Sequence, residues 1–535
     1  MLSRNSTVRR RLWVSRFAKP RPDRGQFYKP LNKTGKTYGQ ILKSSALIGG
    51  SSVVNIGLTA VRTKAMALLL GPAGIGLLGL YGSICDLTRT VAGMGINSSG
   101  VRQIAEAVGS GDSQRIARTV TTLRRVAFYS GALGAVLLLV FCKPVARLTF
   151  GDDRRMLAVA LLALAVLFGD VSVGQGALVQ GMRRISDLAR MNVLGALYGT
   201  VFSILIVYFF GEPGLVPALV CAAAMNILTS WWYARKIKVE AVQIGFRQIF
   251  QEASALLKLG AILMVSSLMT LGVYYLVRVL VLHKIGIEAA GYYQAALLLG
   301  GYYVGFVLQA MGADFYPRLT AVANDNVECT RLVNEQMEVG LLIAGPGVLA
   351  TLTFAPWVII LFFSDKFGPA VEILRWVCLG MMLRVASWPM GYILLAKNEG
   401  ELFFWSELCS NVLCLGLTWT GLLIFGLNGT GMAFFAIYVI YFAGIYLIVR
   451  WLCGFRISMP NRRLGFLFVP LIAVVFLSWY FLPHLAAGAL GAVATLLAGV
   501  YSLKTLCALV PLERFPRAAQ RMIVLFRLAP SNIGV

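Results

Sequence analysis

Eight charged side chains stand inside long apolar stretches of the chain, and they are the residues best placed to do chemistry there. A charge in such surroundings is costly unless it is paired or hydrated, by several kcal/mol as an order of magnitude. Charged residues at such positions therefore indicate binding sites or ion pathways. The eight are Arg62, Lys64, Asp86, Arg89, Asp170, Arg278, Arg384 and Glu407.

The spacing of the first four charges separates local pairs from unpaired groups. Asp86 and Arg89 are three residues apart, so on a helix they share one face and can pair with each other. Arg62 and Lys64 are two apart and point to different faces, and neither has an acidic residue one turn away. Arg62 therefore requires an acid from another segment, water or an anionic ligand.

Other kinds of chemistry have little support in the sequence. The nine cysteines are scattered singly without a CxxC pair, which is typical of small buried hydrophobic residues. The two histidines stand alone, so we expect no metal site. The segment Gly35-Lys36-Thr37 resembles the end of a P-loop, but Pro30 replaces the glycine needed earlier. No long loop clusters acids or histidines, as a membrane glycosyltransferase or polymerase would need, so we predict no catalytic residue and no enzyme activity.

The composition indicates which elements carry these charges. The chain has 535 residues, of which 58% are hydrophobic and 13% charged, whereas soluble domains average about 25% charged. Apolar runs recur that are long enough to cross a hydrocarbon core of ~30 Å, and in lipid they must be helices. We predict an all-α polytopic membrane protein with about 14 transmembrane helices, at residues 44–70, 77–101, 119–142, 156–179, 189–210, 215–234, 257–282, 291–317, 334–362, 370–395, 403–425, 429–450, 464–482 and 486–508.

The net charge of +26 would suggest a nucleic-acid partner in a soluble protein, but its placement argues against one. Basic residues concentrate in the N-terminal arm, in alternate loops and in the C-terminal tail. This is the positive-inside pattern, and it places both termini in the cytoplasm. We therefore predict membrane lipids, and no nucleic acid, around the basic segments.

A repeated landmark indicates an internal duplication. The apolar helix that carries Arg62 breaks at 71–76, and the helix that carries Arg278 breaks at 286–291, with Gly71 and Gly76 matching Gly286 and Gly291 at one offset. Two parallel six-helix repeats then form two lobes related by an axis along the membrane normal. The predicted segments are 1–40 (basic cytoplasmic arm), 41–238 (first lobe), 239–254 (cytoplasmic linker), 255–453 (second lobe), 454–510 (two extra helices) and 511–535 (cytoplasmic basic tail).

The duplication predicts where these charges lie relative to one another. Arg62 and Arg278 would lie at similar depth on opposite walls of a cleft between the lobes, where a diphosphate suits two guanidinium forks. Alternatively, each arginine extends to the outer headgroups. Arg384 falls near the repeat equivalent of Asp170, which allows an ion pair between the lobes or a gate that opens when Asp170 is protonated. Asp86 and Asp170 are the carboxylates that could exchange H⁺ or hold Na⁺.

The order of these features resembles a known family. Arg62, the turn 70–76 and the run Gly93-Met94-Gly95-Ile96 ahead of Arg102 are similar to the polysaccharide transporter branch of the multidrug/oligosaccharidyl-lipid/polysaccharide exporter superfamily. Within that branch the chain most resembles bacterial O-antigen and related flippases, over roughly residues 40–453. Fourteen spans, where O-antigen flippases usually have twelve, and a long basic arm depart from the pattern.

The resemblance implies a substrate and a mechanism. An undecaprenyl-diphosphate-linked oligosaccharide would cross the bacterial inner membrane to the periplasmic leaflet by alternating access, driven by an H⁺ or Na⁺ gradient and without a cofactor. Polysaccharide polymerase and chain-length machinery are the implied protein partners. Alternatives are a peptidoglycan-precursor lipid flippase or a drug/cation antiporter of the same superfamily, although the intramembrane charges are basic on balance. We predict substrate-binding residues Arg62, Lys64, Arg89, Arg278 and Arg384, and ion-coupling residues Asp86 and Asp170.

Overall fold

The structure is a computed structural model that describes residues 34–237 and 246–509. Most of the predicted N-terminal arm, part of the predicted linker and the predicted tail lie outside these residues. The chain divides into two units, Met1–Leu47 and Ile48–Val535, and the second holds every feature described below. The part of the predicted linker that is described, from Phe246 onward, is helical.

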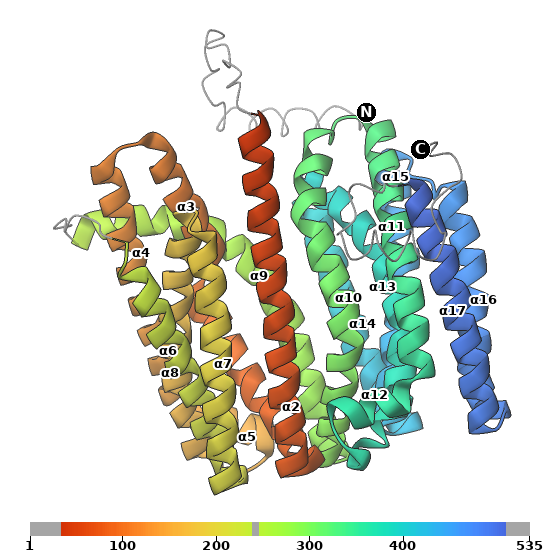
Figure 1. Cartoon of the computed structure of the whole chain (residues 1–535). Coiled ribbons are helices and arrows are strands. Elements are labelled where there is room, and N and C mark those ends of the chain that lie inside the picture. Colours follow the sequence, from red (N-terminus) through yellow and green to blue (C-terminus); the bar gives the residue numbers. More distant parts are fainter. Residues whose placement is uncertain (1–33, 238–245, 510–535) are drawn as a thin grey trace, which may run out of the picture. The chain divides into compact units, whose positions relative to one another are not determined.

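Helices form nearly all of the described chain (Figure 1). The N-lobe contains α2 (Thr34–Gly93, from Ile48), α3 (Ile96–Ser110), α4 (Ser113–Val140), α5 (Cys142–Phe150), α6 (Met156–Gly181), α7 (Ile185–Phe210), η1 (Glu212–Gly214) and α8 (Leu215–Ala234). The C-lobe contains α9 (Phe246–Lys284), α10 (Ile287–Ala321), α11 (Asn326–Thr353), α12 (Ala355–Phe362), η2 (Asp365–Phe367), α13 (Ala370–Ala396), α14 (Gly400–Phe425) and α15 (Asn428–Cys453). The last pair is α16 (Met459–Phe481) and α17 (His484–Leu509).

The predicted fold class is confirmed. Within the described residues, 12 helices are long and apolar enough to cross a membrane. The first of them, Gly50–Gly93, holds two of the predicted spans on either side of a bend, and α10 lies at the place of the remaining predicted span. The protein is therefore a multi-pass membrane protein. Which side faces the cytoplasm, and the boundaries of the predicted segments, stay predictions.

The break predicted at 71–76 is a single residue wide. Gly71 alone leaves the helical conformation, with φ 66° and ψ −164°, and Pro72 starts the next helical stretch without needing a backbone N–H partner. A second break lies at Met94 and Gly95, whose φ values are 42° and 70°. It divides the predicted span 77–101 between α2 and α3, a difference that the continuous apolar pattern concealed.

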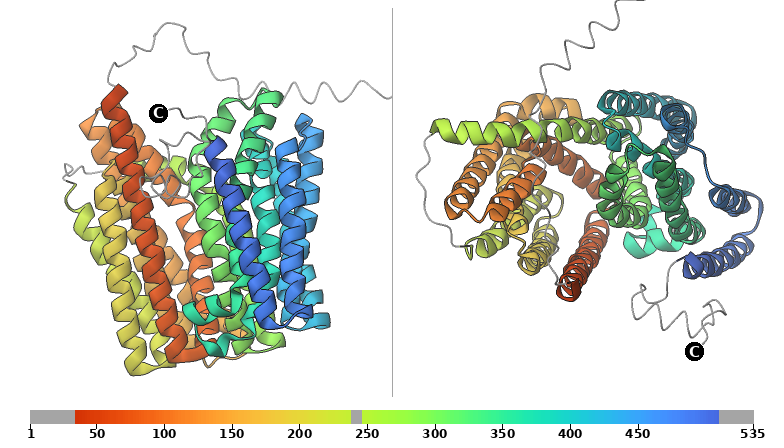
Figure 2. Two further views of the ribbon diagram at one scale, coloured as in Figure 1. Left: turned by 45° about the vertical axis from the view of Figure 1, so that its right-hand side comes forward. Right: turned by 90° about the horizontal axis from the view of Figure 1, so that it is seen from above.

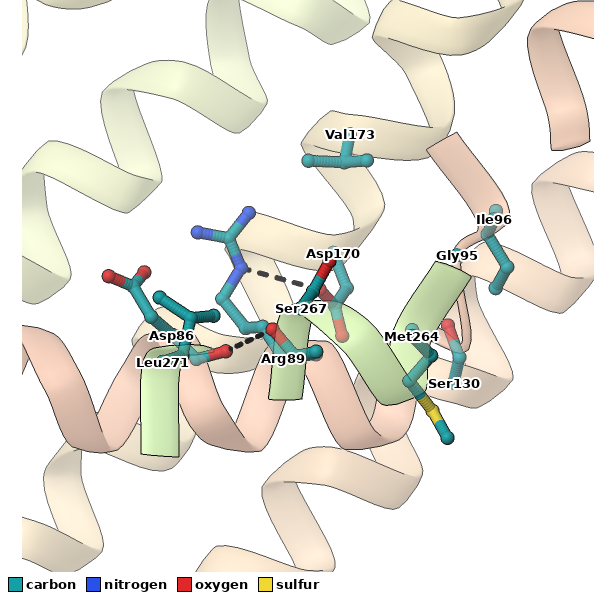
Figure 3. Close-up of a pocket in the computed structure, with 12 residues that line it drawn as sticks. Asp86, Arg89, Gly95, Ile96, Ser130, Asp170, Val173, Met264, Ser267 and Leu271 are labelled. Carbon is teal, nitrogen blue, oxygen red and sulfur yellow. Dashed lines mark hydrogen bonds and ion pairs between the residues drawn. The ribbon is translucent and has the colours of Figure 1, made fainter. Parts of the chain in front are cut away.

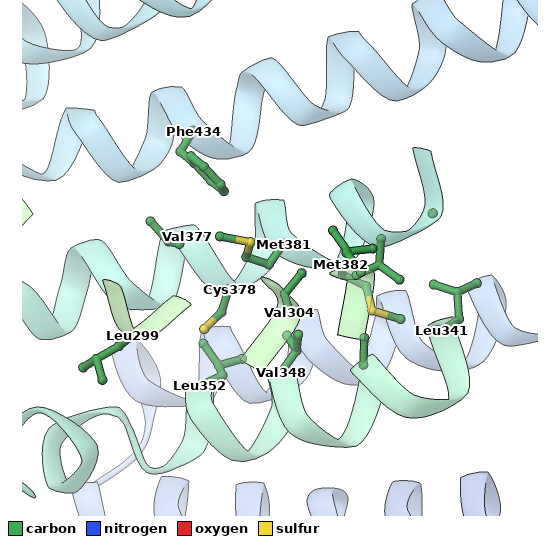
Figure 4. Packing of buried hydrophobic residues seen from close by; sticks show 14 of the residues in the cluster. Leu299, Val304, Leu341, Val348, Leu352, Val377, Cys378, Met381, Met382 and Phe434 are labelled. Atoms are coloured by element: carbon green, nitrogen blue, oxygen red, sulfur yellow. The ribbon is translucent and has the colours of Figure 1, made fainter. Parts of the chain in front are cut away.

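The two lobes lie side by side, and α16 and α17 stand at the outer edge of the C-lobe (Figure 2). In the N-lobe, α6 packs against α3, α4 and α8, and α7 packs against α8. In the C-lobe, α13 contacts α10, α11 and α15. Of the 12 candidate membrane spans it is the most buried, because 72% of its most apolar stretch lies inside the protein. Figure 4 shows this core, to which α13 contributes Val377 and Met381, α11 contributes Val348 and α10 contributes Leu299. Close packing of this kind holds helices together in lipid, where burial from water contributes little.

Two features of the C-lobe matter for the site. The helix α9 contacts α3, α4 and α5 of the N-lobe as well as α10 and α14 of its own lobe, so it bridges both. The pair α16–α17 packs on α11. A buried network fixes its start, because the side-chain amide of Asn461 donates to the backbone oxygen of Asn334 (2.9 Å). Near the C-terminal end of α16, the guanidinium carbon of Arg375 of α13 lies 4.2 Å from the ring centre of Trp479.

Candidate functional site

The two lobes meet at the end where the repeated glycine segments lie. A Cβ atom on Gly291 of α10 would collide with the backbone carbonyl of Pro72, and one on Gly76 would collide with that of Ile287. Only glycine allows backbones to approach so closely. The repeat-related segments 71–76 and 286–291 are therefore in direct contact across the lobe interface.

Arg278 and Arg62 both reach across this interface. The Nε atom of Arg278 donates to Gln294 Oε1 of α10 (2.7 Å), and its Nη1 donates to Ser83 Oγ of α2 (2.6 Å). Arg62, on the repeat-equivalent first helix, lies close enough to Tyr302 of α10 for an electrostatic interaction. Arg278 thus extends from the first helix of its own repeat to the second helix of the other, and the electrostatic interaction of Arg62 with Tyr302 joins the equivalent elements.

Two further contacts tie the lobes together at this end. The ammonium group of Lys64 donates to the backbone oxygen of Ile360, at the C-terminal end of α12 (2.7 Å), where a cation is stabilised by the helix dipole. The hydroxyls of Thr149 on α5 and Tyr275 on α9 share a hydrogen bond of 2.6 Å. In this conformation, Lys64 and Arg278 hold the lobes together with neutral partners.

A cavity of about 410 Å³, the N-lobe cavity, lies between the N-lobe and α9 (Figure 3). Asp86 and Arg89 of α2 and Asp170 of α6 line it, and α9 closes it with Met264, Ser267 and Leu271. The cavity brings together three of the predicted site residues. Arg62, Lys64 and Arg278 are not among the residues that line it.

Arg89 pairs with Asp170, which belongs to a different helix. Its Nε atom lies 3.3 Å from Asp170 Oδ1, and the Asp170 side chain is only 8% exposed. Gly169 makes the room, since a Cβ there would lie 2.7 Å from the guanidinium carbon of Arg89. The second carboxylate oxygen, Asp170 Oδ2, is buried and has no hydrogen-bond partner. An unpartnered buried carboxylate oxygen is unfavourable and is a natural place for a proton, a water molecule or a cation.

This arrangement corrects two interpretations of the sequence. Arg89 was expected to pair with Asp86 on its own helix, but it pairs with Asp170 of α6 instead. The Asp86 side chain is exposed. The ion pair between Asp170 and Arg384 is wrong, because Arg384 lines a different cavity inside the C-lobe. In the part of the chain that the structure describes, no three His, Cys, Asp or Glu side chains converge as metal ligands.

The second cavity measures about 310 Å³ and lies within the C-lobe. Arg384 of α13 and Glu407 of α14 line it together with a set of aromatic side chains. The hydroxyl of Tyr441 donates to Glu407 Oε1 (3.3 Å), and the Arg384 guanidinium carbon lies 5.9 Å from the ring centre of Tyr438. The two charges could be identified from the sequence, but the aromatic lining was missed; it comprises Tyr274, Tyr293, Trp388, Tyr392, Phe403, Phe434, Tyr438 and Tyr441.

A family model for polysaccharide biosynthesis proteins matches residues 65–372, more than half of the chain. The chain belongs to this polysaccharide biosynthesis family. Among curated relatives, the Lipid III flippases of Escherichia coli (strain K12) and Shigella flexneri are each 23% identical over 430 residues, covering 77% of this chain and 99% of the relative. The predicted resemblance to the polysaccharide transporter branch is confirmed.

Solved structures share the fold of this family member. The Lipid II flippase MurJ in its inward closed conformation aligns with a TM-score of 0.64 at 13% identity, covering 87% of this chain and 99% of the other. An inward-facing multidrug resistance transporter of the MATE family and MOP superfamily aligns with a TM-score of 0.61 at 15% identity, covering 75% and 98%. These similarities concern the fold alone.

Proposed function

We propose that this family member is a flippase that moves an undecaprenyl-diphosphate-linked oligosaccharide from the cytoplasmic to the periplasmic leaflet of the bacterial inner membrane. The observation that carries the proposal is a pair of cavities, one between the N-lobe and α9 and one within the C-lobe, each lined by an arginine and by hydrogen-bonding groups. The names of the curated relatives, both Lipid III flippases, support the same substrate class. Both termini would lie in the cytoplasm.

Alternating access would operate at the lobe interface. The lobes touch through Gly76 and Gly291, and Arg278 and Lys64 tie them together there. When this end opens, both side chains lose their partners on the opposite lobe, and Arg62 moves away from Tyr302. The three cations would then face the opening gap, where the cargo diphosphate could bind them. The predicted binding of a diphosphate between Arg62 and Arg278 would therefore occur in the conformation that is open at this end.

The N-lobe cavity is the proposed site of ion coupling. Asp170 holds Arg89 through one carboxylate oxygen while the other is unpartnered, and Asp86 lies beside them. A proton or Na⁺ at Asp170 would weaken its attraction for Arg89 and free the guanidinium for the cargo. Coupling to a gradient would need no cofactor. Polysaccharide polymerase and chain-length machinery are the protein partners that would receive the product.

A drug/cation antiporter is the second candidate, because the C-lobe cavity has the aromatic lining that suits organic cations. Arg384 in the same cavity opposes it by repelling a cationic drug. Deletion of the gene in the organism that carries it separates the two. The flippase proposal predicts loss of surface glycan and accumulation of its lipid-linked precursor, with unchanged sensitivity to cationic dyes. Normal glycan with raised dye sensitivity would refute it in favour of the antiporter.

A further inference from the structure

We infer that the C-lobe cavity is a saccharide-binding site, in which sugars of the cargo are held between Arg384, Glu407 and an aromatic wall. The inference rests on the proposed function and adds to it a second binding site, separate from the one that takes the diphosphate. The cavity lies wholly on helices α9, α10, α13, α14 and α15.

The two charges of the cavity select the chemical class of the ligand. Arg384 and Glu407 line the same space, and each has a tyrosine as its partner there: Tyr274 for Arg384 and Tyr441 for Glu407. Opposite charges that stay apart inside a membrane protein need hydrogen-bonding groups, and one tyrosine hydroxyl each leaves both Arg384 and Glu407 with further capacity toward a ligand. A diphosphate alone would be repelled by Glu407, and an alkali cation or cationic drug by Arg384. A polyhydroxylated neutral group can donate to Glu407 and accept from Arg384 at once.

The aromatic wall supports the same class. Tyr274, Tyr293, Tyr438 and Tyr441 surround the cavity, and each offers an apolar ring face together with a hydroxyl. Trp388 adds a further ring, with its centre 4.5 Å from that of Tyr392. The C–H faces of a sugar ring pack against aromatic rings, while its hydroxyls need polar partners at the ring edge. Both kinds of surface are present here at one site.

The size of the cavity and the contrast between the lobes sharpen the assignment. A volume of about 310 Å³ is at the small end for ligand sites, which run from roughly 300 to 1,000 Å³. It suits the end of a saccharide rather than an entire oligosaccharide. The described lining of the N-lobe cavity, in contrast, contains no aromatic residue, and its arginine is already paired with Asp170. Of these two cavities, the C-lobe cavity alone combines rings with an arginine and an acid that are held apart.

The test uses the full chain in lipid nanodiscs and two probes, citronellyl diphosphate and the same molecule carrying N-acetylglucosamine. We expect the wild-type protein to bind the glycosylated probe at least about tenfold more tightly, as measured by titration calorimetry. Tyr441→Phe, which removes one hydroxyl, should reduce this preference about fivefold, the effect of one neutral hydrogen bond. Trp388→Leu should reduce it further, and neither variant should alter binding of the bare diphosphate.

Matched controls lie outside the cavity. Tyr446→Phe, on the same helix as Tyr441, and Trp405→Leu, whose side chain is exposed, should keep the wild-type preference. Equal binding of the two probes by wild-type protein would overturn the saccharide site and leave the flippase proposal standing. A preference that survives in Tyr441→Phe and Trp388→Leu would likewise overturn the site. If neither probe binds, both the proposed cargo and the saccharide site are refuted.

Discussion

Replacing Gly291 with valine should open the end at which the lobes meet. The Cβ atom would overlap the backbone carbonyl of Pro72, and backbone cannot swing aside as a flexible side chain would. The only relief is to separate α10 from α2, which is the motion that alternating access needs. The variant therefore destabilises the conformation described here relative to the one open at this end.

The size of the effect follows from the nature of the contact. Overpacking costs about 1–3 kcal/mol, and a clash with rigid backbone places Gly291→Val at about 3 kcal/mol. Since each ~1.4 kcal/mol is a factor of ten, the ratio of the two states should change by roughly a hundredfold. A closed state that held about 99% of wild-type molecules would fall to about half.

Electron-resonance distance measurements can follow this shift. Spin labels on keto amino acids at Arg154 and Lys366, both exposed, report the separation of the lobes at this end and leave the native cysteines untouched. Gly291→Val should move a large population to longer distances. Gly301→Val is the matched control on the same helix, because a Cβ at Gly301 meets nothing within 4 Å. If the Gly291 variant gives the wild-type distribution, the glycine contact does not hold the lobes together.

Three further predictions concern the charged residues. Substituting alanine for both Arg62 and Arg278 should abolish surface glycan export while the protein still inserts, as seen by membrane fractionation with glycan staining; normal export would remove both arginines from cargo binding. Asp170→Asn should abolish the response of transport to a pH or Na⁺ gradient, measured in proteoliposomes, and an unchanged response would exclude Asp170 from coupling. Gly169→Ala should displace Arg89 from Asp170 and reproduce the Asp170→Asn behaviour. Gly176→Ala on the same helix, where a Cβ meets only Met191 at 3.4 Å, should behave like wild type, and a similar effect of both alanines would contradict the role of Gly169.

Much of the fold could be predicted because its signals are local. Each span is a continuous apolar run, and glycines at matching positions, such as Gly76 and Gly291, reveal the duplication. That these two glycines touch each other also follows from two-fold symmetry, once the lobes are placed side by side. The break at Met94 and Gly95 could not be located, since the apolar pattern continues through it.

The site was harder to predict because its contacts join distant parts of the chain. Arg89 has an acid three residues away, yet it pairs with Asp170 on another helix, where Gly169 leaves room for the guanidinium. The aromatic wall draws Tyr274 and Tyr438 from helices far apart in sequence, and no spacing rule connects them. Single charges in apolar runs can be read from a sequence, but their partners depend on which helices pack together.

Translocation of a defined glycolipid by the purified protein tests the proposed flippase activity most directly. The chain would be reconstituted into liposomes that contain an undecaprenyl-diphosphate saccharide with a nitrobenzoxadiazole label on the sugar, and external dithionite would quench whatever reaches the outer leaflet. We predict that the protein makes nearly all of the label quenchable, and that Arg62→Ala with Arg278→Ala abolishes this. The flippase proposal would be contradicted if only the fraction initially in the outer leaflet were quenched, with or without the protein.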